Sequence, residues 1–434
     1  MSLKEGRWAL AAGVVVHLLM LLSLRGQFLN PLFVEARDSH GQAADYFGIY
    51  AAGDHLVHGR SIYQTNAGGN GATEDVPYSY FYRYLPPTAY VAALSSLFLS
   101  PWTGYLVWVI ATELLLLLAV RGILRFPGAR GADRRLQAGI WLGFLPFYLE
   151  QWMGQFSLLM AFFLWTILRG AETGRSAGMR EAPPGKGGLI AWAASIALKS
   201  YTALFALSYL RRGWIRPVLY AAGLVILSCA PYYLARPEDL GTFLELNLGL
   251  FPGEIYPGTL GLSAFVRQAG WCLPDELASR RLALAGLDVS VGNLPVVAAN
   301  LLILGLSVWI VLRHGRRCSM TLQISLWVLA FFLIFKDVWE YHYVMLLPVL
   351  SVLALRYRSP LIPWLALALA LPTPYLLVAD RQGGLTQIGS LIQHASKALP
   401  TLALFIWVVA TARREANRGT GARGPIGSRA ATLP

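Results

Sequence analysis

The chain is organised around the run Ala44-Asp45-Tyr46-Phe47-Gly48-Ile49-Tyr50-Ala51-Ala52-Gly53-Asp54-His55-Leu56, in a long polar loop after the first apolar segment. Apolar and aromatic residues recur in this run at helical spacing, which predicts a short amphipathic helix lying at a membrane surface. Asp45 would stand at the start of this helix, where the positive end of the helix dipole favours an ionised carboxylate. Because such a carboxylate can take a proton from a hydroxyl group, Asp45 is a candidate general base.

The composition is that of a membrane protein. Hydrophobic residues make up 56% of the 434 residues and charged residues 14%, with a mean hydropathy of +0.51. Apolar stretches that approach the roughly 20 residues of a membrane-spanning helix lie at 8–24, 105–120, 217–235, 294–312 and 360–379. Their apolar residues run continuously rather than alternating, which predicts an all-α polytopic bundle of about a dozen transmembrane helices. The first stretch lacks a small-residue cleavage site, so we expect a retained helix.

The charge pattern indicates orientation in a membrane rather than binding of nucleic acid. The net charge is +13, but the arginines sit in short loops beside apolar segments, as in proteins that obey the positive-inside rule. The three cysteines, Cys229, Cys272 and Cys318, are far apart and show no metal-ligand spacing. We therefore expect no nucleic-acid partner, no disulfide framework, no zinc site and no cofactor, although a divalent cation stays open.

The cationic loops predict which parts of the chain face outward. Placing them in the cytoplasm leaves an outer loop 25–87, a second outer segment 236–293, the Gly154-Gln155 turn, Lys199 and residues 336–342 outside. The segment 89–99 is then too short to cross the membrane, because about 20 residues are needed. We expect residues 1–412 to form the integral-membrane domain. The Gly- and Arg-rich residues 413–434 would form a basic, disordered cytoplasmic tail near anionic lipids.

The outer loop ends in Arg83-Tyr84-Leu85-Pro86-Pro87, directly before an apolar run. Paired prolines favour the first turn of a helix, where a missing N–H loses no hydrogen bond. Arg83 at headgroup depth could donate two hydrogen bonds to a phosphate, or it could be a simple interfacial anchor. We therefore consider Arg83 a candidate phosphate ligand.

Two further segments place polar groups at membrane depth. The run Glu150-Gln151-Trp152-Met153-Gly154-Gln155 joins two apolar segments by a turn with two glutamines, which favours a wet cavity or a bound ligand. Lys199 interrupts the apolar segment 191–210, and its ammonium group needs an anionic partner unless it reaches past the helix end to water. Gln155 and Lys199 are therefore candidate ligands of an anionic substrate.

A last cluster of ionisable groups is Lys336-Asp337-Val338-Trp339-Glu340-Tyr341-His342-Tyr343, just before another apolar run. His342 could donate to a phosphate or move a proton, and Glu340 could bind the substrate. The two are only two residues apart, and the sequence supplies no further spacing that would name a metal site. A plain polar loop remains the alternative for this cluster.

These motifs, in this order, resemble the C-type membrane glycosyltransferases and, within them, glycosyltransferase family 87, the polyprenyl-phosphate-mannose-dependent mannosyltransferases and their relatives. The resemblance covers most of residues 40–350 and rests on Asp45-Tyr46 with Tyr50-Ala51-Ala52, Gly59-x-x-x-Tyr63, Tyr84-Leu85-Pro86-Pro87, Gly154-Gln155-Phe156-Ser157-Leu158-Leu159, Ala197-Leu198-Lys199 with Arg211-Arg212-Gly213-Trp214, and Trp339-Glu340-Tyr341-His342-Tyr343. The sequence departs from the family pattern at two places, which bear on the identity of the sugar and the acceptor and not on the enzyme class. Ser157 stands where Asn is usual, and residues 257–263 lack a frequent Asn-Gln-Ser, although Arg267 follows as expected.

The resemblance implies an inverting glycosyltransferase that moves a sugar, with mannose favoured, from a polyprenyl-phosphate donor to a lipid or glycan acceptor. The reaction would take place at the outer face of the plasma membrane, with Asp45 as the single base. Arg83 and Lys199 would supply cations for the donor phosphate, with Gln155, Glu340 and His342 as further ligands. A transporter or flippase of a lipid-linked saccharide is the alternative from another class. A non-catalytic membrane scaffold subunit is a third.

Overall fold

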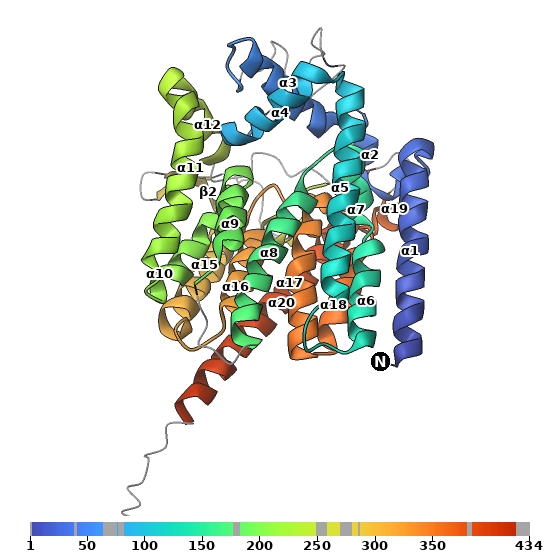
Figure 1. Cartoon of the computed structure of the whole chain (residues 1–434), viewed down its shortest axis with the longest axis vertical. Helices are drawn as coiled ribbons and strands as arrows, with labels where there is room; N and C mark the ends of the chain where they lie inside the picture. Colours follow the sequence, from blue (N-terminus) through green and yellow to red (C-terminus); the bar gives the residue numbers. More distant parts are fainter. Residues whose placement is uncertain are drawn as a thin grey trace, which may run out of the picture.

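The protein is a bundle of helices of unequal length (Figure 1). The structure is a computed structural model, and it describes residues 2–38, 41–63, 76, 82–176, 183–248, 258–269, 280–284, 287–379 and 384–421. Five of the described helices are long and apolar enough to cross a membrane: α1 (Leu3–Gly26), α5 (Pro101–Leu124), α11 (Ile215–Ala235), α15 (Leu294–His314) and α20 (Gln387–Gly421). The fold is therefore an all-α membrane helix bundle, as the sequence predicts.

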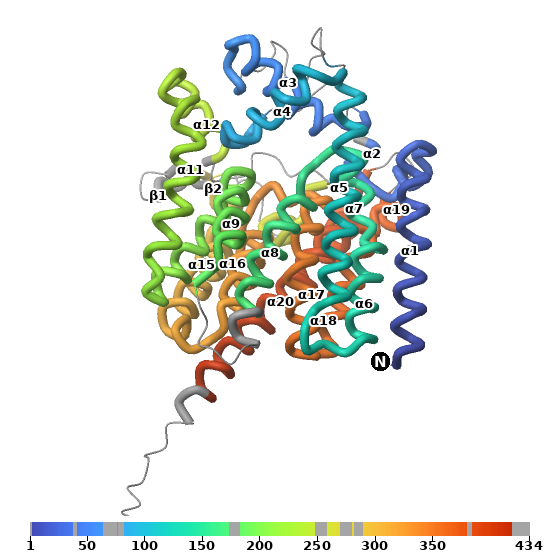
Figure 2. The backbone as a smooth tube through the Cα atoms, in the orientation of Figure 1, coloured from blue at the N-terminus to red at the C-terminus, as the bar shows by residue number. Residues whose placement is uncertain are grey.

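Shorter elements fill the bundle and cover one end of it. They are η1 (Asn30–Leu32), α2 (Val34–Asp38), α3 (Ala44–Val57), α4 (Pro86–Phe98), α6 (Gly131–Leu142), α7 (Pro146–Met153), α8 (Ser157–Ser176), α9 (Lys186–Leu198), η2 (Ser200–Leu204), α10 (Phe205–Arg211), α12 (Glu238–Leu248), α13 (Leu262–Ala269), η4 (Val291–Asn293), α16 (Met320–Ile334), η5 (Glu340–Leu346), α17 (Leu347–Tyr357), α18 (Leu361–Ala370) and α19 (Tyr375–Val378). The described residues also include one antiparallel hairpin, β1 (Arg281–Leu284) and β2 (Leu287–Ser290) (Figure 2).

Four of the five predicted spans fall within α1, α5, α11 and α15. The fifth prediction, residues 360–379, is wrong, because α18 ends at Ala370 and the chain continues through Pro372-Thr373-Pro374 before the short α19. A proline disfavours helical backbone in the residue before it, so the two prolines end the helix in an otherwise apolar stretch. The fifth long apolar helix is α20 instead.

The predicted start of a disordered tail at residue 413 is also wrong. Helix α20 continues to Gly421, and its Glu415 anchors the last turns by accepting hydrogen bonds from the Ser319 N–H at 2.9 Å and the Tyr357 hydroxyl at 3.0 Å. Arg356 adds an ion pair to the same carboxylate at 3.3 Å. These buried contacts outweigh the polar composition, and residues 422–434 lie outside the described part of the chain.

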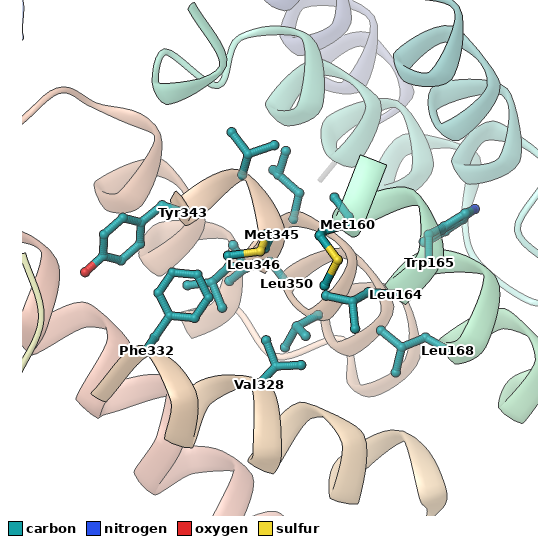
Figure 3. Close-up of a cluster of buried hydrophobic side chains, with 14 of the residues drawn as sticks. Met160, Leu164, Trp165, Leu168, Val328, Phe332, Tyr343, Met345, Leu346 and Leu350 are labelled. Atoms are coloured by element: carbon teal, nitrogen blue, oxygen red, sulfur yellow. The ribbon is translucent and has the colours of Figure 1, made fainter. Parts of the chain in front are cut away.

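The helices pack closely in the middle of the bundle. Glycines allow α1 and α6 to touch, since a Cβ added to Gly13 would lie 2.3 Å from the Gly139 carbonyl oxygen. The central apolar core is formed by α8, α16, η5 and α17 (Figure 3). In it, the rings of Phe332 and Tyr343 lie 5.1 Å apart. This core fixes η5 relative to α8.

Helices α3 and α4 cover one end of the bundle, whereas the N-terminus and the last turns of α20 lie at the other end (Figure 1). Helix α4 has 13 residues, fewer than the roughly 20 that a membrane-spanning helix needs. Gly53 of α3 sits directly on α4, because a Cβ there would lie 2.4 Å from the Ala92 carbonyl carbon. The helical prediction for residues 44–56 is confirmed, but the prediction of an amphipathic helix is wrong, since neighbouring helices bury α3 on almost every side.

Candidate active site

The start of α3 is fixed against the turn between α7 and α8. The Ala43 N–H donates to the Trp152 carbonyl at 2.7 Å, which joins the two segments through their backbones. Gly154 adopts a φ of +73°, and a Cβ at this position would lie 2.4 Å from the Tyr46 Cβ. Only glycine fits this backbone and this contact. Asp45 is therefore placed beside Gln155.

The turn itself is held by buried hydrogen bonds. The Glu150 side chain accepts the N–H of Leu158 at 2.5 Å, near the start of α8, and the Gln155 N–H donates to the Glu150 carbonyl at 3.0 Å. Trp108 of α5 donates its indole N–H to the Gln155 carbonyl at 3.0 Å. The second Glu150 carboxylate oxygen is buried with no hydrogen-bond partner. Burial raises the pKa of this carboxyl well above its ordinary value, and the charge of Lys199 opposes this shift.

The entry into α4 brings two more side chains to this point. Pro86 and Pro87 occupy the first turn of α4, as the sequence predicts. Just before them, the ring of Tyr84 packs edge-on against Phe156 with ring centres 4.4 Å apart. Arg83 is half-exposed and forms an ion pair with Asp337 at 3.6 Å. The Arg83 charge also acts on Asp45.

Lys199 follows the last residue of α9 and points into the same group. Its ammonium nitrogen lies 5.9 Å from the centre of the Phe156 ring. Burial lowers the pKa of Lys199 to about 7, although the negative charges of Glu150 and Asp45 oppose this shift. Glu150 and Asp45 are thus the anionic partners that the sequence requires for this lysine.

The turn η5 completes the group from the opposite side of the bundle. The Tyr341 hydroxyl accepts a hydrogen bond from the Gln155 side-chain amide at 3.4 Å. His342 accepts the Trp339 N–H at its Nδ1, 3.0 Å away, which leaves the proton of the neutral ring on Nε2. Burial, and then the charge of Lys199, lower the pKa of His342 well below its ordinary value. His342 is therefore a neutral hydrogen-bond donor.

Asp45 has the buried environment and the free acceptor atom that a general base needs. Burial raises the pKa of its carboxyl to about 6, while Gln155, Lys199 and Arg83 act in the opposite direction. The helix dipole alone predicts that the ionised form is favoured, but burial acts against this form and is the larger effect. One of its oxygens is buried with no hydrogen-bond partner, which leaves an acceptor free for a substrate hydroxyl.

The structure brings together five of the six predicted site residues: Asp45, Arg83, Gln155, Lys199 and His342. Glu340 points elsewhere, because Thr373 and Lys397 occupy both of its oxygens. Sequence reasoning missed Glu150 and Tyr341 as members of the site. Both residues belong to motifs described in the sequence analysis. Only the fold shows that Glu150 lies near Lys199 and that Tyr341 contacts Gln155. Within the described residues, no three His, Cys, Asp or Glu side chains are grouped to hold a metal ion.

The chain is similar to one protein family and to a solved structure. The sequence model of glycosyltransferase family 87 matches residues 82–335, which is more than half of the chain. The chain is also similar to the crystal structure of ArnT from Cupriavidus metallidurans in the apo state, with 17% identity and a TM-score of 0.38. That similarity covers 92% of this chain and 72% of the other. A search of the curated proteins gave no match.

Proposed function

Because the chain belongs to glycosyltransferase family 87, we propose that this membrane enzyme uses a polyprenyl-phosphate sugar, with mannose favoured, as its donor. The acceptor is a hydroxyl group of a lipid or a glycan. The reaction takes place at the outer face of the plasma membrane, where α3 and α4 cover the bundle. Glycosyl transfer as such follows from the family, whereas the donor, the sugar and the membrane face are our proposal.

The observation that supports this proposal best is the pairing of one carboxylate with two cations at one end of an apolar bundle. Asp45 lies within the electrostatic reach of both Lys199 and Arg83. A donor whose lipid tail lies in the bilayer would present its phosphate at this depth, where charge-assisted hydrogen bonds to Lys and Arg are strong. The adjacent carboxylate would then lie close to the sugar.

The chemistry needs one base and a stabilised leaving group. Asp45 takes the proton of the acceptor hydroxyl while the acceptor oxygen forms a bond to the anomeric carbon, and the bond from that carbon to the phosphate oxygen breaks. The leaving polyprenyl phosphate keeps the bonding electron pair, and Lys199 and Arg83 neutralise its charge. A single displacement of this kind inverts the anomeric carbon, so one carboxylate is sufficient. Asp45 then releases its proton to water.

His342 and Gln155 are placed to orient the donor. The Nε2–H of His342 and the amide of Gln155 are hydrogen-bond donors beside Lys199 and Asp45. Glu150 opposes the burial-driven fall in the Lys199 pKa more than Asp45 does. We assign Glu150 the role of counter-ion and not of a base, since its carboxylate also caps the start of α8.

A transporter or flippase of lipid-linked saccharides is the alternative. Transporters place their substrate site near the middle of the membrane, between structural repeats. Here the candidate site lies under α3 and α4, at one end of the bundle (Figure 1). This position favours transfer at a membrane face over passage through the bundle.

The two proposals can be separated with purified protein. We would incubate it with a panel of polyprenyl-phosphate sugars and an acceptor extract, and measure the release of free polyprenyl phosphate. Transfer predicts release with at least one sugar and its loss in Asp45→Asn. Movement of a labelled lipid across a proteoliposome membrane without any release would favour the flippase, and Asp45→Asn turnover equal to wild type would remove the base assigned here.

A further inference from the structure

A buried network of charges lies directly behind the candidate site. Glu340 and Lys397 form an ion pair at 3.2 Å, and their side chains are each 1% exposed. The pair lies where the chain is broken between α18 and α19, at Pro372-Thr373-Pro374. Burying two charges costs free energy unless further hydrogen bonds satisfy them. The hydrogen bonds around this pair therefore determine whether it stabilises the fold.

Both charges are fully satisfied by the broken helix. The Glu340 carboxylate accepts the Thr373 N–H at 2.9 Å and the Thr373 hydroxyl at 3.2 Å. Lys397 donates to two carbonyl groups at the end of α18, that of Leu369 at 2.8 Å and that of Leu371. With Glu340 as the third acceptor, all three ammonium protons have partners. Glu340 is therefore occupied by protein groups on both of its oxygens.

A second carboxyl holds the backbone of the same residue. The Glu35 side chain, from α2, accepts the Glu340 N–H at 3.0 Å. Burial, and then the neighbouring charge of Glu340, raise the pKa of Glu35 to about 8, so this group carries a proton at neutral pH. Burial raises the pKa of Glu340 as well, and the charge of Lys397 opposes this shift.

The network includes a residue that is directly next to two site residues in the sequence. Glu340 is the first residue of η5, and the next two residues are Tyr341, which accepts the Gln155 amide, and His342, which lies beside Lys199. No residue separates the anchored position from the site residues. Any displacement of Glu340 is therefore passed directly to Tyr341 and His342.

We propose that Glu340 and Lys397 form a clamp that fixes η5 against α20 and the α18–α19 break, and thereby positions Tyr341 and His342 against Gln155 and Lys199. Glu340 is then a positioning residue and not a ligand of the donor. Its effect on catalysis rests on the proposed function, whereas its effect on η5 does not. Lys397 is one of four polar residues that α20, a helix that could cross a membrane, buries, with Gln393, His394 and Thr401.

The test compares Glu340→Gln with Glu172→Gln. Glu172 is also a largely buried carboxylate with a cationic partner, Arg356. It lies on α8, 15 residues beyond Ser157 at the start of this helix, which is a distance of about 22 Å along the helix axis at 1.5 Å per residue. The first measurement is hydrogen exchange of the amides of residues 340–346. We expect faster exchange there in Glu340→Gln and wild-type exchange there in Glu172→Gln.

The second measurement is turnover per folded molecule. A shift of about 1 Å at a reacting site can cost on the order of 10²-fold, so we expect Glu340→Gln to lose about 10- to 100-fold. Combining Glu340→Gln with Tyr341→Phe should cost less than the product of the two single losses, because both act through the Gln155 contact. Glu172→Gln should keep turnover close to wild type.

Unchanged exchange in η5 of Glu340→Gln would overturn the clamp, as would equal losses in Glu340→Gln and Glu172→Gln or a fully multiplicative double variant. If wild-type protein released polyprenyl phosphate from no donor, the proposed function would fail. The exchange measurement would still decide whether the clamp fixes η5. The two failures are thus distinguishable.

Discussion

At the scale of single residues, Asp45 carries the clearest prediction. Asp45→Asn should keep folding and donor binding, because the amide has nearly the same shape, and should lose turnover by about 10²- to 10⁴-fold, the contribution of a general base. Asp38→Asn, at the end of α2 and seven residues before Asp45, should lose far less. Turnover is measured with saturating donor and acceptor, and a value near wild type for Asp45→Asn would contradict the assignment.

The pH dependence follows from the same group of residues. Asp45 must be ionised to act as base, so with its pKa raised to about 6 activity falls as the pH drops through 6. Lys199 must be charged to hold phosphate, so with its pKa lowered to about 7 activity falls as the pH rises above 7. We expect kcat/KM, which reports the free enzyme, to peak between these values. In Lys199→Arg the alkaline limb should move upward, because a guanidinium stays protonated; an unmoved limb would assign it to another group.

The two cations should contribute to donor affinity more than to folding. Loss of a charge-assisted hydrogen bond costs about 1.5–3 kcal/mol, so Lys199→Ala and Arg83→Ala should each weaken donor binding by that order. Arg83 is half-exposed and its ion pair with Asp337 is partly screened, so we expect the smaller effect there. Binding is measured in detergent on folded protein. Equal affinity in wild type and both variants would place the phosphate elsewhere.

Some site residues can be identified from the sequence alone, and others cannot. Asp45, Arg83 and Lys199 are visible because a charge at the edge of an apolar segment is costly and therefore conspicuous. Glu150 is not, since its role depends on the fold bringing the end of α7 beside the end of α9. Glu340 shows the opposite error: a carboxylate in an outer segment suggests a ligand, and only the structure shows that Lys397 and Thr373 occupy it.

At the scale of elements, hydropathy predicts a helix well when apolar side chains cover all its faces. Helices α5 and α15 are of this kind, and their predicted and observed bounds agree closely. Helix α20 is not, because its buried polar residues lower the hydropathy of a segment that packs inside the bundle. The stretch 360–379 fails for a local reason, since Pro372 and Pro374 interrupt it.

The turn between α7 and α8 offers a prediction about an element. Gly154→Ala must adopt a φ of +73° and also bring a Cβ within 2.4 Å of the Tyr46 Cβ, so it should displace the start of α3 and lower turnover. Gly128 has a φ of +71° with no atom within 4 Å of its added Cβ. Gly128→Ala therefore carries only the backbone cost of roughly 1–2 kcal/mol. Turnover and thermal unfolding of the two variants are compared. Equal turnover losses would show that the contact with Tyr46 does not contribute to turnover.

At the scale of the whole molecule, the direction of the bundle decides where the reaction takes place. The N-terminus and the last described turns of α20 lie at one end, and α3 and α4 lie at the other (Figure 1). Cationic residues gather at the first end, among them Arg313, Arg316, Arg317, Arg413 and Arg414. The positive-inside rule favours a cytoplasmic position for that end, which supports our proposal that the site under α3 faces outward.

Single cysteines in a cysteine-free background test this orientation. A cysteine at Asn70, which lies outside the described residues but inside the outer loop, should react with a membrane-impermeant thiol reagent added to intact cells. A cysteine at Ser2, next to the exposed start of α1, should react only after the cells are opened. Among the described residues, α1 is the one candidate span between the two positions, so we expect them on opposite sides of the membrane. Labelling of Asn70→Cys from the cytoplasm alone would reverse the bundle, place Asp45 on the inner face, and require a donor whose phosphate is presented there.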